Sequence, residues 1–104
     1  MVAKVNRREY DIEPITINGI GVSKVVIDPH YEEKHGDDID DDLILELVKK
    51  LDRRIELPEA IDEKFSYFVT LLDLKKKKYR LIWLLEKDAI YIGVVNAYRD
   101  DRKE

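Results

Sequence analysis

The sequence predicts an α+β domain in which one long and one short helix pack on one face of an antiparallel sheet of about four to five strands. Three observations support this prediction. β-Branched and aromatic runs occupy both ends of the chain, an amphipathic helical stripe occupies the middle, and turn signals separate these segments. The expected order is strand, strand, helix, helix, strand, strand, strand (ββααβββ).

Length and composition favour a single domain spanning residues 1–104, because a chain of 104 residues can build one core but not two. The absence of cysteine excludes a disulfide framework and thiolate metal sites. No apolar run reaches the roughly 18 residues that span a membrane, so we expect a cytoplasmic protein without membrane contact. Residues 1–9 are expected to form a flexible leader and residues 100–104 a frayed tail.

The first two strands are predicted to form a hairpin. They are expected from Ile12 to Ile17 and from Ile20 to Ile27, joined at Asn18-Gly19, which is a strong tight-turn signal. Pro14 lacks a backbone N–H and therefore restricts the first strand to the edge of the sheet. An exposed edge of this kind offers a route to a homodimer through strand pairing.

Two helices are predicted next. Asp28-Pro29 begins the short one, with Asp as N-cap and Pro at the first helical position, and this helix should cover residues 30–35 and stop at Gly36. The long helix is capped by Asp40 and is indicated by apolar residues that recur three or four positions apart. These residues are Ile39, Leu43, Ile44, Leu47, Val48 and Leu51.

The second half of the chain is predicted to be mostly strand. Residues 55–62 form a linker that contains Pro58, with one helical turn at Glu59–Asp62. Three strands, Phe65 to Leu72, Tyr79 to Leu85 and Ala89 to Tyr98, follow, joined by turns at Leu74–Lys78 and Glu86–Asp88.

The charges are unevenly distributed. Residues 28–63 carry five basic and fourteen acidic side chains, net −9, whereas residues 64–104 carry ten basic and six acidic ones, net +4. The sheet-forming half is therefore basic and suited to a polyanion, and the alternative is ordinary surface charge. The acidic run at residues 37–42 lacks the glycine and closing glutamate of a calcium loop, which favours helix capping over metal binding. We expect neither a metal nor a cofactor.

The C-terminal hairpin carries the most informative motif. Tyr79-Arg80 opens one of its apolar runs and Tyr98-Arg99 closes the other, so folding should bring these four residues together. The guanidinium group is a fixed fork of donors that matches phosphate oxygens. If the turn centres on Lys87-Asp88, the register places Arg80 and Arg99 on one face of the sheet and Tyr79 and Tyr98 on the other.

His30 and His35 are the only histidines, and they lie in the short helical segment together with Lys34. Histidine is the natural general acid or base near neutral pH. Positions five residues apart do not share a helix face, which argues against a two-histidine metal site.

The hairpin resembles the C-terminal half of the RelE/ParE-type toxins of bacterial and archaeal toxin–antitoxin systems. Those proteins carry a Tyr-Arg-apolar strand, a short acidic turn and an apolar strand with a basic and aromatic end. Upstream, the strand Val25–Ile27, the pattern His30-x-x-x-Lys34-His35 and the amphipathic helix look like the wider barnase/EndoU/colicin/RelE nuclease superfamily. The likeness covers roughly residues 22–99.

The resemblance implies a metal-independent endoribonuclease that holds RNA on its sheet and has a cognate antitoxin protein as partner. Such enzymes use the ribose 2′-hydroxyl as nucleophile and need a base, an acid and cations that stabilise the phosphorane. It implies His30 or His35 as base or acid, Arg80 and Arg99 as phosphate clamps, Lys34 as supporting cation, and Tyr98 as stacking or acid residue. The alternative is a non-catalytic protein- or nucleic-acid-binding module on the same fold, which the net charge of −4 favours.

Overall fold

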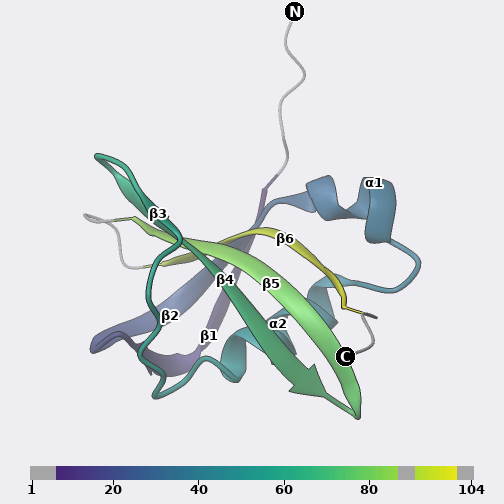
Figure 1. The fold of residues 1–104 in the computed structure, drawn as a ribbon, viewed down its shortest axis with the longest axis horizontal. Helices are drawn as coiled ribbons and strands as arrows, with labels where there is room; N and C mark the ends of the chain where they lie inside the picture. The colour runs from purple at the N-terminus through teal and green to yellow at the C-terminus, as the bar shows by residue number, and fades with distance from the viewer. Residues whose placement is uncertain (1–6, 87–90, 101–104) are drawn as a thin grey trace, which may run out of the picture.

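The computed structural model describes residues 7–86 and 91–100 and contains a six-stranded mixed sheet (Figure 1). The strands lie in the order β1-β2-β6-β5-β4-β3, and all neighbours are antiparallel except β2 and β6, which are parallel. Their bounds are β1 (Arg8–Ile17), β2 (Ile20–Ile27), β3 (Ala60–Ile61), β4 (Phe65–Leu74), β5 (Lys77–Glu86) and β6 (Ile92–Arg99). The α+β class is confirmed, whereas the prediction of an all-antiparallel sheet of four to five strands is wrong.

The helical segment between β2 and β3 contains a 3₁₀ turn, η1 (Pro29–Tyr31), and two short helices, α1 (Glu32–His35) and α2 (Asp41–Lys49). In Figure 1, α2 lies behind the sheet and α1 lies beside it, near β6. Both predicted N-caps are confirmed. The Asp28 carboxylate accepts a hydrogen bond from the His30 N–H at 2.9 Å, and the Asp40 carboxylate accepts one from the Leu43 N–H at 2.8 Å.

The prediction of a long helix is wrong, because α2 has only nine residues. Its apolar stripe nevertheless points at the sheet as expected, and Leu51 is fully buried although it lies beyond the end of the helix at Lys49. Turn-type hydrogen bonds continue past the helix, among them those from Leu51 N–H to the Val48 carbonyl and from Arg54 N–H to the Leu51 carbonyl. The periodicity of the sequence therefore predicts the buried face correctly and the helical length incorrectly.

The first strand begins four residues earlier than the hydrophobic alternation predicts. Arg8 pairs with Ile27 and Tyr10 with Val25, so these two side chains lie on the face of the sheet that α2 covers. Polar side chains on a core face interrupt the apolar pattern and hide the strand from sequence analysis. The predicted leader 1–9 is thus too long by at least Arg8 and Glu9, while residues 1–6 lie outside the described residues.

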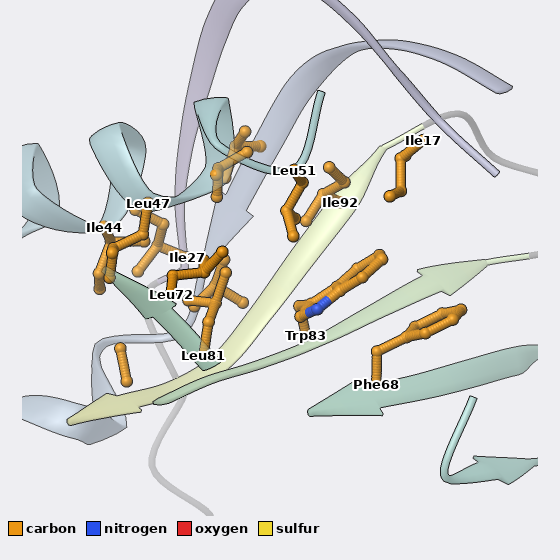
Figure 2. Packing of buried hydrophobic residues seen from close by; sticks show 14 of the residues in the cluster. Ile17, Ile27, Ile44, Leu47, Leu51, Phe68, Leu72, Leu81, Trp83 and Ile92 are labelled. Atoms are coloured by element: carbon orange, nitrogen blue, oxygen red, sulfur yellow. The ribbon is translucent and has the colours of Figure 1, made fainter. Parts of the chain in front are cut away.

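The core lies between α2 and the sheet, and its side chains come from every strand except β3 (Figure 2). Trp83 is at its centre, fully buried and stacked on Phe68 with ring centroids 4.1 Å apart. Its indole N–H donates to the Thr70 hydroxyl at 3.0 Å, and that hydroxyl donates to the Glu56 carboxylate at 2.6 Å. The one buried polar side chain among the described residues, Thr70, thereby has both a donor and an acceptor as neighbours.

The predicted tight turn at Asn18-Gly19 is confirmed, with φ of 53° and 76° at the two positions. The Asn18 side chain also fixes the linker, because its amide accepts from the Glu56 N–H at 2.6 Å and donates to the Glu56 carbonyl at 3.1 Å. Residues 60–61 then form β3 against β4, where a helical turn was predicted at Glu59–Asp62. That prediction is wrong because the backbone of this segment bonds to Tyr67 and Phe65 rather than to itself.

The turn between β4 and β5 is tighter than predicted. Leu74 pairs with Lys77, so only Lys75 and Lys76 form the loop, and both have positive φ (52° and 68°). Two consecutive left-handed residues match the twist of a hairpin, but this conformation is unfavourable for a side chain such as lysine.

Replacing Lys76 with glycine should therefore stabilise the protein by about 0.5–1 kcal/mol, because glycine adopts positive φ without steric cost. Urea unfolding followed by circular dichroism measures the difference. Lys78→Gly is the matched control, since Lys78 is equally charged and exposed but extended within β5. It should destabilise the sheet by about 0.5–1 kcal/mol, and a loss of stability in both variants would contradict this account of the turn.

Candidate functional site

A β-bulge in β6 decides which side chains face away from α2. Ile82 pairs with Asn96 and Trp83 with Val94, so Val95 is the inserted residue. The Asn96 side chain helps to satisfy the interrupted ladder, because its Oδ1 accepts from the Ala97 N–H at 2.9 Å. Since side chains alternate along a strand, one inserted residue moves all later side chains of β6 to the other face.

The bulge corrects the predicted register of the hairpin. Arg80 pairs with Tyr98 and Tyr79 with Arg99, where the prediction placed the two arginines on one face and the two tyrosines on the other. Tyr79 is buried on the helix-covered face, and Arg99 is its cross-strand neighbour there. Arg80 and Tyr98 lie together on the opposite face. The predicted four-residue cluster is thus divided into two Tyr/Arg pairs, one on each face.

We call the face opposite α2 the open face. It has an apolar centre, with Arg80, Asn96 and Tyr98 near one end. The residues that form it include Val26, Phe65, Tyr67, Val69, Leu71, Arg80, Ile82, Leu84, Val95, Asn96 and Tyr98, with the charged Asp73, Lys78 and Glu86 at its ends. A shallow pocket of about 160 Å³ occupies its other end, between Arg7, Phe65 and Tyr91, and none of the sequence-predicted site residues lines it.

The structure brings three of the predicted site residues together at the end of the open face. The His35 ring, at the end of α1, lies against the Tyr98 ring with centroids 5.1 Å apart. Tyr98 is in turn the cross-strand neighbour of Arg80. The Arg80 guanidinium donates to the Asp100 carboxylate at 3.0 Å, while its Nε is buried without a hydrogen-bond partner among the described residues. We call His35, Tyr98, Arg80 and Asp100 the histidine–arginine cluster.

The other three predicted residues lie elsewhere or face away. His30 is exposed and its Nδ1 lies 2.8 Å from Glu33 Oε2, one turn along the same segment. Lys34 is exposed on α1, beside His35 in sequence. Arg99 lies on the face that α2 covers, next to Tyr79. The Asp100 N–H donates to the Lys78 carbonyl, so Asp100 is not part of the predicted frayed tail, and the rest of that prediction, residues 101–104, lies outside the described residues.

A partly buried carboxylate fixes the segment that carries the histidines. Asp41, in the first turn of α2, accepts from the Arg8 guanidinium at 2.5 and 2.9 Å, from the Tyr10 hydroxyl at 2.5 Å and from the Tyr31 hydroxyl at 2.8 Å. Its side chain is only 14% exposed. The three donors come from β1 and η1, so one carboxylate joins the edge strand, the helix and the turn that leads to His35.

These contacts shift the titration of the groups involved. Burial by itself raises the pKa of Asp41, but the hydrogen bonds from Arg8, Tyr10 and Tyr31 outweigh it and hold that pKa below its ordinary value of 3.8. The pKa of Tyr31 is raised, first by burial and then by its hydrogen bond to Asp41. Sequence analysis assigned Asp41 only to helix capping and missed this role, because Arg8 and Tyr10 are distant in the chain.

The acidic run at residues 37–42 acts mainly through its position at the start of α2. Asp40 is the N-cap, and Asp41 and Asp42 occupy the first turn, where negative charge complements the helix dipole. Among the described residues, no group of three or more His, Cys, Asp or Glu side chains is arranged to hold a metal ion.

Comparisons with known proteins give no relative. No protein-family model, curated protein or solved structure matches this chain significantly. Within the described ranges, 7–86 and 91–100, no helix is long and apolar enough to cross a membrane.

Replacing Asp41 with asparagine should destabilise the fold by about 1–2 kcal/mol at neutral pH, because it removes the negative charge that the partly exposed Arg8 faces and weakens the hydrogen bonds of the Tyr10 and Tyr31 hydroxyls. The pKa of Asp41 is lower in the folded protein, so its contribution is present above pH 3.8 and is lost as the pH falls below that value. Urea unfolding at neutral and acidic pH should therefore show a smaller difference between variant and wild type in acid.

Asp42→Asn is the control, since Asp42 is exposed in the same turn and its loss should cost about 0.5 kcal/mol. An equal cost for both variants would mean that Asp41 acts only through the helix dipole.

Proposed function

We propose that this protein is a metal-independent endoribonuclease whose active site is the histidine–arginine cluster. The observation that carries the proposal is the contact of the His35 ring with Tyr98, whose cross-strand neighbour is Arg80. An imidazole, an aromatic hydroxyl and a guanidinium then lie at one end of the open face. This is the set of groups that ribose-assisted RNA cleavage requires.

In this reaction the 2′-hydroxyl attacks the adjacent phosphorus, forming a 2′-O–P bond while the P–O5′ bond breaks. One group removes the 2′ proton and another protonates the departing 5′-oxygen, leaving a 2′,3′-cyclic phosphate and a 5′-hydroxyl. His35 fits either proton-transfer role. Tyr98 has two candidate roles, as in the family that the sequence resembles. Its ring could stack on a base, or its hydroxyl could carry out the second proton transfer.

Arg80 fits the role of the phosphate-binding cation. Asp100 holds one edge of its guanidinium, and an arginine has five N–H donors, so donors remain for a phosphate after this contact. Lys34 lies on the same short helix as His35 and places a further positive charge on that segment. The proposed site does not use Arg99, because the bulge turns that side chain to the helix-covered face.

A second function, binding without catalysis, is favoured by the apolar centre of the open face. Leu71 and Val69 are among the exposed large hydrophobic residues of the protein, and both lie on this face. Apolar sheet surfaces of this kind bind protein partners more readily than they bind RNA. For this second function, we propose an antitoxin-like protein as the partner.

The proposal is tested by incubating purified protein with single-stranded RNA in excess EDTA. We expect wild type to leave 2′,3′-cyclic phosphate ends, and His35→Ala and Arg80→Ala to lose activity by about 10²-fold or more. Tyr98→Phe separates the two roles of Tyr98, because it keeps the ring for stacking and removes the hydroxyl.

Two matched controls lie in the same chain. His30→Ala removes a histidine that is exposed and paired with Glu33, and Arg53→Ala removes an exposed arginine far from the cluster in sequence. The Arg53 variant should keep full activity, and the His30 variant should lose less activity than the His35 variant. Absence of cleavage by wild type, or equal activity in all variants, would leave binding as the function of the open face.

A further inference from the structure

The two outer edges of the sheet are protected to very different extents. An unprotected edge strand presents a row of backbone donors and acceptors that can pair with another chain. On β1, the first half of the edge carries exposed charges at Glu9, Asp11 and Glu13 and then Pro14, which has no N–H to donate. Along the second half, the linker covers the edge, with Arg53 N–H bonded to the Thr16 carbonyl at 2.6 Å.

At the opposite edge of the sheet, the short strand β3 covers only a small part of β4, and the rest of β4 is the edge strand. β3 pairs with Ser66 and Tyr67 alone, so β4 continues well past it (Figure 1). The Tyr67 carbonyl accepts from the Glu59 N–H at 2.7 Å and therefore points outward. Because backbone groups alternate along a strand without a bulge, those of Val69, Leu71 and Asp73 also point outward, beyond the reach of β3.

Two of the three open-face side chains beside this uncovered backbone, Val69 and Leu71, are apolar, and the third, Asp73, is charged. Leu71 is 49% and Val69 37% exposed on the open face, and no charged residue lies between Phe65 and Leu72. Edges of monomeric proteins are usually interrupted by a charge, a proline or a bulge, and β4 has none of them before Asp73. The edge therefore has both the backbone groups and the apolar surface that strand pairing uses.

We propose that β4 pairs antiparallel with β4 of a second copy, about a two-fold axis through Leu71, to form one continuous sheet across a homodimer. In this register Leu71 faces Leu71 of the second copy and Val69 faces Asp73. The outward backbone groups of each strand then meet in hydrogen-bonded pairs. The pairing between the two copies cannot extend to Tyr67, because β3 already pairs with β4 there.

The charges at the two ends of β4 complement each other in this arrangement. The end near β3 carries Glu59, Asp62 and Glu63 against a single lysine, Lys64, whereas the other end carries the lysine turn 75–78. Antiparallel pairing brings the basic end of each copy to the acidic end of the other, whereas parallel pairing would join like charges. Since the β1 edges are protected, the assembly closes at two copies and does not continue into a filament.

The protein has no cysteine, which allows a direct test with the single variant Leu71→Cys. Residues that face each other in a hydrogen-bonded antiparallel pair have Cα atoms about 5.5 Å apart, within the roughly 4.4–6.8 Å that a disulfide spans. Mild oxidation should therefore convert Leu71→Cys to a covalent dimer. Ile20→Cys is the matched control, because Ile20 is 43% exposed but lies at the β1–β2 turn, and it should stay monomeric.

Sedimentation of the unmodified chain gives the second readout, with a dimer expected at submillimolar concentration and weaker association at high salt. Leu71→Pro should be monomeric with an unchanged circular dichroism spectrum, because it removes an N–H that points away from β5. A monomeric wild type, or equal crosslinking of the two cysteine variants, would overturn the proposal. So would a wild type that pairs its β4 edge only with a strand of a different protein.

Discussion

The insertion of Val95 into β6 is the constraint on which the division of the sheet into two faces depends. Without it, the alternation that buries Ile92 and Val94 would continue to Asn96 and Tyr98, and the polar Asn96 amide would lie under α2. With it, the small and fully buried Ala97 takes that position. Burying an unpaired amide costs about 1–3 kcal/mol, so the core favours the bulge. The same insertion turns Tyr98 toward Arg80 and makes the histidine–arginine cluster possible.

The Asp41 carboxylate holds the other half of that cluster in place. A carboxylate offers about four acceptor positions, and the two tyrosine hydroxyls and the Arg8 guanidinium fill most of them. Tyr31 is thereby tied to α2, and the short segment that follows it must pass beside β6 and end with His35 on Tyr98. A contact within the interior of the protein thus determines the position of a histidine at its surface.

Features governed by neighbours in sequence could be predicted, and features governed by distant residues could not. Asp28, Asp40 and the Asn18-Gly19 turn act on backbone groups within three residues. The residue types at these positions were therefore enough to predict the two N-caps and the turn. The parallel pairing of β2 with β6 and the binding of Arg8 to Asp41 join distant segments and leave no local periodicity. The hairpin was recognised, but one unforeseen residue in its second strand reversed the faces of Tyr98 and Arg99. His35, Tyr98 and Arg80 were named from the sequence, whereas Asp100 and Asp41 were not.

The place of β6 in the sheet has a consequence for how the chain folds during its synthesis. β6 is the last of the strands in the described residues, yet it lies in the interior of the sheet, between β2 and β5. The β1–β2 hairpin and the β3–β5 meander are therefore separate pieces until β6 emerges from the ribosome and inserts between them. Pairing β2 with β6 closes a long loop, and such non-local contacts form slowly. Until β6 inserts, the two half-sheets have exposed edges, and this is the stage of folding at which aggregation is the main risk.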